Sequence, residues 1–227
     1  MAQFPLGRRI SKDDRDRGYL MTRLLRKEIL PTRKTWKIGA ANLDQGDTAA
    51  CVGNAWANFL RSAPIQTTAT EQTAWQIYDR AIKLDEWTDN DNDTDRQMGT
   101  SVRAGAEAVM GVGRLKSYVW AFSLQPVVEW VLTQGPVVLG TNWYTSMFYP
   151  SKEGLIDITP RSRVEGGHAY LLRGVDTRKA MATFCNSWGD SWGKSGNFFM
   201  SFKTLERLIL EDGGEACSAV EKRLETK

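Results

Sequence analysis

The period of the hydrophobic pattern changes near the middle of the chain, and this change restricts the fold more than any other feature. Apolar residues recur at helical spacing in the first part, whereas β-branched and aromatic runs dominate the second. Helices are expected over 51–63, 70–84, 99–113, 124–134 and 203–212, and strands over 136–143, 168–176, 181–188 and 196–202. The pattern therefore predicts an α+β fold, with a helical lobe at about 45–122 and a sheet lobe at about 123–217.

A basic arm precedes this body. Residues 1–37 carry a net charge of +7, and residues 38–227 carry −4. Residues 1–18 are expected to be extended and solvated. Residues 19–30, YLMTRLLRKEIL, have helical apolar spacing up to Pro31 and predict a short amphipathic helix docked on the body. The arm could also cover a cleft between the two lobes, bind a protein partner or simply keep the protein soluble.

Composition excludes several classes of function. The net charge of the 227 residues is only +3, too small to indicate a nucleic-acid partner. No apolar run approaches the ~18 residues of a membrane span, and the N-terminus lacks the apolar core of a signal peptide. Three cysteines and one histidine form neither a disulfide framework nor a metal site, so we expect no cofactor. These features favour a cytoplasmic protein, or a virion-associated one if a phage encodes it.

Cys51 lies where a helix is expected to begin. Unpaired N–H groups at a helix N-terminus favour a thiolate and lower the pKa of the thiol. His168, the sole histidine, could lower that pKa further by becoming its cationic partner. Cysteine and histidine together can act as nucleophile and general base.

Two amide side chains could complete this chemistry. Asn186, eighteen residues after His168, could accept the ring N–H and hold the tautomer of the imidazole. Gln45, six residues before Cys51, could donate an N–H to the oxyanion of a tetrahedral intermediate. The backbone N–H of Cys51 could supply the second donor.

Three blocks of this sequence resemble the signature blocks of the papain-like cysteine peptidases. They are Gln45-Gly46…Ala50-Cys51, Gly167-His168-Ala169 and Asn186-Ser187-Trp188-Gly189. Their order and the glutamine-to-cysteine gap agree with that family, and the resemblance covers roughly residues 36–205. It is specific because the blocks occur together and in order.

The resemblance implies a papain-like two-lobed fold and a cysteine endopeptidase that needs no cofactor. In such a fold Cys51 heads the central helix, His168 faces it from the sheet lobe, and the substrate, a peptide or protein, lies between the lobes. Catalytic roles are implied for Cys51, His168, Asn186 and Gln45. Residues implied to contact the substrate or shield the site are Gly99, Gly167, Ala169 and Trp188.

The sequence also departs from the family pattern. Val52 replaces a tryptophan, Ala49 replaces a glycine, and Thr48 stands where secreted members have a disulfide cysteine. Only about forty residues precede Gln45, too few for the usual inhibitory prosegment. The chain is thus more similar to the compact, prosegment-free members of bacteria and phages.

Two other functions remain open at this stage. One is a cell-wall peptide hydrolase or transamidase with the same Cys, His and polar residue order. The other is a non-catalytic scaffold or phage assembly protein, since a fold does not guarantee activity. An intact triad argues against the scaffold, because a scaffold does not need all three residues.

Overall fold

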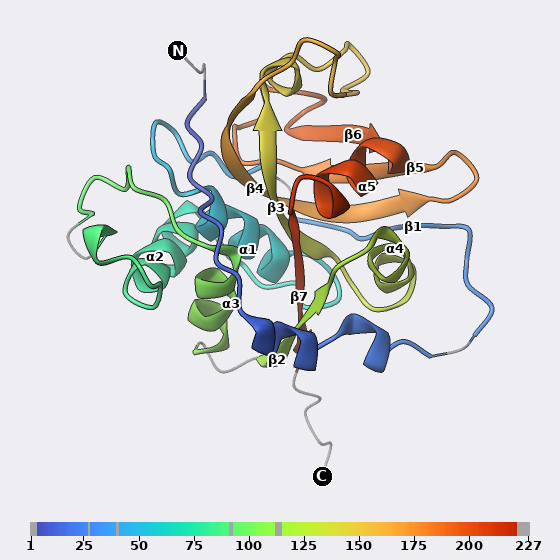
Figure 1. Cartoon of the computed structure of the whole chain (residues 1–227), viewed down its shortest axis with the longest axis horizontal. Coiled ribbons are helices and arrows are strands. Elements are labelled where there is room, and N and C mark those ends of the chain that lie inside the picture. The colour runs from blue at the N-terminus through green and yellow to red at the C-terminus, as the bar shows by residue number, and fades with distance from the viewer. Residues whose placement is uncertain (1–3, 27, 40, 91–92, 112–114, 222–227) are drawn as a thin grey trace.

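A computed structural model describes residues 4–26, 28–39, 41–90, 93–111 and 115–221. Helices α1 (Cys51–Arg61), α2 (Glu71–Ile82) and α3 (Val102–Met110) pack together on one side of a sheet. Helices α4 (Leu124–Thr133) and α5 (Phe202–Leu210) pack against strands of the same sheet (Figure 1). The predicted α+β class is confirmed.

The sheet is antiparallel and has the order β2-β7-β3-β4-β5-β6 among the described residues, with β1 paired to β4 off this path. Its strands are β1 (Arg33–Thr35), β2 (Leu115–Ala121), β3 (Val137–Tyr144), β4 (Val164–Asp176), β5 (Met181–Cys185), β6 (Asn197–Ser201) and β7 (Glu215–Glu221). The register pairs Thr141 of β3 with His168 of β4. This places the histidine in the N-terminal half of the longest strand, against which α1 packs.

Local sequence signals begin the helices where they were expected. Ser101 caps α3 by accepting the N–H of Ala104, and Thr70 forms a capping box with Thr73 at the start of α2. Helix α1 starts at Cys51 without a side-chain cap, since Ala50 precedes it. The first-turn amides of α1 are thus not satisfied by a capping side chain.

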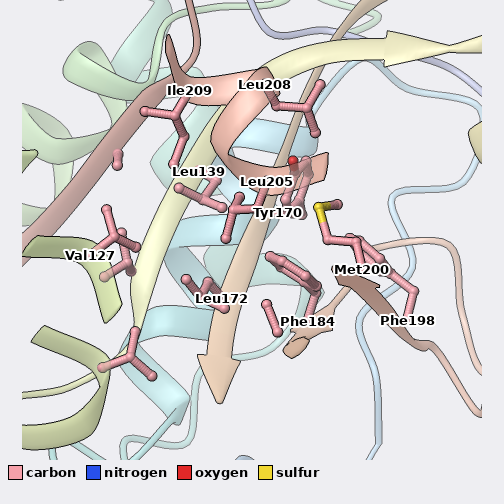
Figure 2. Close-up of a cluster of buried hydrophobic side chains, with 14 of the residues drawn as sticks. Val127, Leu139, Tyr170, Leu172, Phe184, Phe198, Met200, Leu205, Leu208 and Ile209 are labelled. Atoms are coloured by element: carbon pink, nitrogen blue, oxygen red, sulfur yellow. The ribbon is translucent and has the colours of Figure 1, made fainter. Parts of the chain in front are cut away.

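The sheet lobe has an aromatic and aliphatic core. Figure 2 shows Leu205, Leu208 and Ile209 of α5 projecting toward side chains of the sheet. The rings of Phe184 and Phe198 stack with centroids 4.6 Å apart. A second core lies between helices α1–α3 and the other side of β3 and β4, and it includes small residues such as Ala169. The strands that carry the site are therefore packed on both faces.

Two expectations for the N-terminal arm were wrong. Residues 19–30 do not form a regular helix: a 3-10 turn, Met21–Arg23, is all that is helical among those described. Met21 is buried, and Leu25 and Leu30 pack partly buried against the same core, so apolar side chains dock this segment without further helical turns. Nor are residues 1–18 uniformly solvated, because Gly7 and Arg8 are buried against the body.

The sequence pattern did not predict strands β1, β2 and β7.

No helix in the described ranges has the length and apolar character needed to cross a bilayer.

Close packing of α3 on α1 yields a stability prediction. A Cβ at Gly105 would lie 2.4 Å from Trp56 and 2.7 Å from Val52. Gly105→Ala should therefore lower the free energy of unfolding by about 1–3 kcal/mol, despite the gain of up to ~1 kcal/mol in helix propensity. Gly18→Ala is the matched control, since nothing lies within 4 Å of its added Cβ. Urea unfolding should show a change of no more than about 0.5 kcal/mol for the control; an equal, small change in both variants would contradict the packing.

Candidate active site

Cys51 is the first residue of α1 and is fully buried. The backbone N–H groups of Ala169, Gly7 and Val52 all favour its thiolate. Ala169 directly follows His168 on β4, so the contact brings the thiol and the histidine strand together. The third contact comes from the N-terminal arm, to which Gly7 belongs.

His168 lies on β4, and its Nε2–H donates to Oδ1 of Asn186 at 2.7 Å. Since a carbonyl oxygen only accepts, this bond puts the ring proton on Nε2 and leaves Nδ1 as the free acceptor. Nδ1 is buried and has no hydrogen-bond partner among the described residues. The imidazole is thus held in one tautomer, with its basic nitrogen unoccupied.

Aromatic rings enclose the imidazole. Trp188 stacks on it at 4.5 Å between centroids, and Trp143 meets it edge-on at 4.9 Å. Burial lowers the pKa of His168 to about 4, although the bond to Asn186 acts in the opposite direction. The ring is therefore neutral at physiological pH in this structure.

Gln45 lies in the loop before α1, with its side chain fixed at both ends. Its Oε1 accepts from the Ser187 hydroxyl at 2.7 Å, which identifies Nε2 as the donor. Nε2 donates to the Thr48 carbonyl at 2.6 Å and to the Pro5 carbonyl at 3.2 Å. One partner of this amide is thus a peptide carbonyl of the N-terminal arm.

Residues 4–9, which we call the cover segment, cross the site between the two lobes. Figure 1 shows this blue segment running in front of α1, between the first helices and strands β3, β4 and β7. The N–H groups of Gly7 and Arg8 donate to the Gly167 carbonyl at 3.1 and 2.9 Å. On the helical side, Thr100 donates to the Gly7 carbonyl and accepts from Arg9, both at 2.9 Å.

The cover segment also closes the site at its aromatic end. The ring of Phe4 stacks on Trp188 at 4.7 Å with an interplanar angle of 12°. A Cβ at Gly7 would lie 1.8 Å from the Ala49 carbonyl oxygen, so only glycine lets the segment pass this close to the start of α1. Cys51 and His168 are both fully buried with the segment in this position.

This burial overturns the expectation that the pKa of Cys51 is lowered. Desolvation raises the pKa of the thiol to about 11, and the three backbone N–H groups offset only part of the increase. The thiol and the imidazole are both neutral in this structure, and they do not form an ion pair.

The structure places the four residues that were expected near the substrate at different points of the site. Gly167 and Ala169 flank His168 on β4, and Trp188 covers its ring. Gly99 donates its N–H to the Tyr78 hydroxyl at 2.8 Å. It also lies against the cover segment, since a Cβ at Gly99 would be 2.2 Å from the Gly7 carbonyl oxygen. The backbone of Thr100, its neighbour, contacts the cover segment. Thr100 could not be predicted from the sequence, because no side-chain pattern signals a backbone contact.

The described cysteines are all free thiols. Cys185 points away from the imidazole and donates to Oδ1 of Asn42 at 3.2 Å. Within the described ranges, no group of three or more His, Cys, Asp or Glu residues is placed to hold a metal ion. The reactive groups of the site are therefore those around Cys51 and His168.

A family model described as "Papain family cysteine protease" matches residues 46–210. The chain belongs to this family. The match spans Cys51, His168 and Asn186, and it confirms that the chain is a papain-like cysteine peptidase.

Solved structures of papain-family proteases share the fold of this chain. Xylellain, a cysteine protease from Xylella fastidiosa, is 19% identical with a TM-score of 0.78 over 97% of this chain and 96% of its own. Procathepsin L2 from the Tenebrio molitor larval midgut is 15% identical, with a TM-score of 0.66 over 96% and 78%. The ragweed pollen allergen Amb a 11, in its proform, is 13% identical, with a TM-score of 0.58 over 86% and 67%. No curated protein matches the chain by sequence.

The buried imidazole makes the stability of this papain-family chain sensitive to acid. The pKa of His168 falls from 6.5 to about 4 on folding, so the unfolded chain binds its proton first as the pH drops. The contribution is complete above pH ~6.5 and is lost toward pH ~4. Relative to His168→Gln, the wild type should lose about 2–3 kcal/mol of unfolding free energy between pH 7.5 and 4.5. Urea unfolding at four pH values measures this, and parallel curves would contradict it.

Proposed function

We propose that the chain hydrolyses peptide bonds in peptide or protein substrates through a thioester on Cys51. In the first half-reaction, Nδ1 of His168 takes the thiol proton, and the sulfur attacks the scissile carbonyl carbon. The C–N bond breaks as the imidazolium gives its proton to the leaving amine. Water then attacks the thioester with His168 as base, the C–S bond breaks, and the carboxylic acid product leaves.

Asn186 and Gln45 have positioning and stabilising roles in this proposal. Asn186 accepts from Nε2, so Nδ1 is the nitrogen left for proton transfer. Gln45 donates to the oxyanion, together with the backbone N–H of Cys51. The observation that carries the proposal is the hydrogen bond from the Gln45 amide to the Pro5 carbonyl, 3.2 Å away, which supports a role for this donor in binding a peptide carbonyl.

The cover segment makes the proposed enzyme latent in this arrangement. The segment occupies the backbone groups of Gly167 and Thr100, and a substrate backbone that lay in the same place would need these groups. Displacing the segment restores water to Cys51 and His168, which removes the largest cause of their shifted pKa values. Three free thiols support a reducing compartment, such as the cytoplasm, or the virion if a phage encodes the chain.

The proposal predicts that hydrolysis depends on Cys51. In protein carrying Arg8→Ala, which weakens the cover segment, Cys51→Ala should lower kcat/KM for internally quenched peptides by about 10³-fold or more. Cys185→Ala is the control, since it removes a thiol outside the reacting centre. If Cys51→Ala left hydrolysis unchanged, the nucleophile would be misassigned; if neither form hydrolysed any peptide, the scaffold alternative would lead.

A second prediction tests the oxyanion donor. Gln45→Glu keeps the size of the side chain but replaces the N–H donor with an acceptor. In the same Arg8→Ala background, kcat should fall by about 10²–10³-fold while KM changes little, because the donor acts mainly in the transition state. Steady-state kinetics and thermal unfolding should be measured on the same samples. A large rise in KM with unchanged kcat would assign Gln45 to ground-state binding instead.

A further inference from the structure

Arg8 is the most deeply buried charged side chain of the cover segment. Its side chain is 0% exposed, and Nε and a terminal nitrogen both lie 2.8 Å from Oε2 of Glu215. The Gly213 carbonyl accepts a longer hydrogen bond, 3.4 Å, from the same guanidinium. Arginine is rarely buried to this degree without a partner. The partner lies 207 positions away, at the start of β7.

Two glycines leave the space that this side chain fills. A Cβ at Gly140 would lie 3.0 Å from Nε of Arg8 and 2.5 Å from Val102. A Cβ at Gly167 would lie 2.1 Å from the Arg8 carbonyl oxygen and 3.0 Å from its Cδ. Gly140 of β3 pairs with Glu215 of β7. The glycine that leaves room for the Arg8 side chain and the carboxylate that binds it therefore lie on adjacent strands. We call this space the Glu215 pocket.

The chemistry of the Glu215 pocket suits a cation. Its polar end presents two acceptors, the Glu215 carboxylate and the Gly213 carbonyl, to the guanidinium. Burial raises the pKa of Glu215 to about 7, while Arg8 acts to lower it. A buried carboxylate without a counter-charge is costly, so a cationic side chain would be favoured there over an apolar or acidic one.

The Glu215 pocket lies directly beside the reacting centre. The backbone N–H of Gly7, the residue before Arg8, acts to lower the pKa of the Cys51 thiol and donates to the Gly167 carbonyl at 3.1 Å. The Arg8 N–H itself donates at 2.9 Å to Gly167, the residue before His168. A peptide backbone that paired with Gly167 and Thr100 as the cover segment does would place one side chain in this pocket, and the neighbouring residues would pass over Cys51.

We propose that the Glu215 pocket selects peptide substrates with an arginine or lysine side chain close to the scissile bond, and that Arg8 occupies the substrate's place in this structure. This inference rests on the proposed peptidase function. Glu215 is then the residue that determines specificity, and Arg8→Ala opens the pocket to other chains.

Binding can test the pocket without requiring turnover. Fluorescein-labelled hexapeptides that differ at one position, carrying arginine, citrulline or leucine there, are titrated into full-length protein with Cys51→Ala and Arg8→Ala. The variable position is scanned along the peptide. Citrulline matches arginine in shape but lacks its charge. At one position, the arginine peptide should bind at least tenfold more tightly than the citrulline peptide.

Two comparisons locate the effect. Adding Glu215→Gln should bring the arginine and citrulline peptides within about twofold of each other, whereas Glu211→Gln, on the exposed end of α5, should leave their ratio unchanged. Restoring Arg8 should weaken arginine-peptide binding tenfold or more, and Arg9→Ala in that protein should not reverse this. Far-UV circular dichroism confirms that each variant is folded.

The outcomes separate this inference from the proposed function. Arginine preference that Glu215→Gln abolishes supports the pocket even if no peptide is hydrolysed. Equal binding of the three peptides at every position, or a preference that survives Glu215→Gln, overturns the pocket even if hydrolysis depends on Cys51. Because the triple variant with Cys51→Ala, Arg8→Ala and Glu215→Gln contains no buried unpaired charge at this point, its folding does not depend on the interaction under test.

Discussion

The backbone pairing of Gly7, Arg8 and Arg9 with the two walls of the site is the interaction on which the rest of the arrangement depends. Gly167 provides one wall and Thr100 the other, with donor–acceptor distances of 2.9–3.1 Å. These bonds hold the Pro5 carbonyl at Gln45, place Gly7 over Cys51 and direct Arg8 toward Glu215. Together with the ion pair between Arg8 and Glu215, these bonds hold a charged arm in the interior of the protein.

The same pairing decides the protonation state of the reactive residues. A helix N-terminus favours an anion by about 0.3–1 kcal/mol, and up to ~2 kcal/mol in buried geometries. Full burial can shift a pKa by 3–5 units, which corresponds to about 4–7 kcal/mol. Desolvation therefore outweighs the position of Cys51 at the start of α1, and the thiol stays neutral. The residues of a catalytic site are thus present, but burial under the cover segment keeps the Cys51 thiol and the His168 imidazole neutral.

Local patterns predicted much of the fold because the signals are local. Ser101, Thr70 and the helical periods defined α1–α4, and runs of β-branched and aromatic residues defined β3–β6. Strand β7, EACSAVE, was missed because alanine, cysteine and serine carry little strand preference, and its pairing with β2 and β3 is a tertiary effect. The helix expected over residues 19–30 did not form, because Met21, Leu25 and Leu30 reach the core from a segment that, in its described part, makes only the 3-10 turn Met21–Arg23.

The residues of the site could be predicted from three sequence blocks, but their state could not. The bond between His168 and Asn186 agrees with the expected pairing. For the basic arm, the sequence left open whether it is solvated or covers a cleft, because charge patterns do not identify a partner as distant as Glu215. The raised pKa of Cys51 follows from that contact and from the close passage of Gly7, and neither is visible in the sequence.

The rate of Cys51 alkylation by iodoacetamide as a function of pH tests the central claim most directly. It should be read by peptide mass spectrometry in wild type and in Arg8→Ala, with buried Cys185 as the internal reference. We predict slow labelling of wild-type Cys51 that increases only at strongly alkaline pH, and labelling at least tenfold faster near neutral pH in Arg8→Ala, with Cys185 unchanged. Rapid labelling of wild-type Cys51 at pH 6, at the same rate in both proteins, would contradict the account.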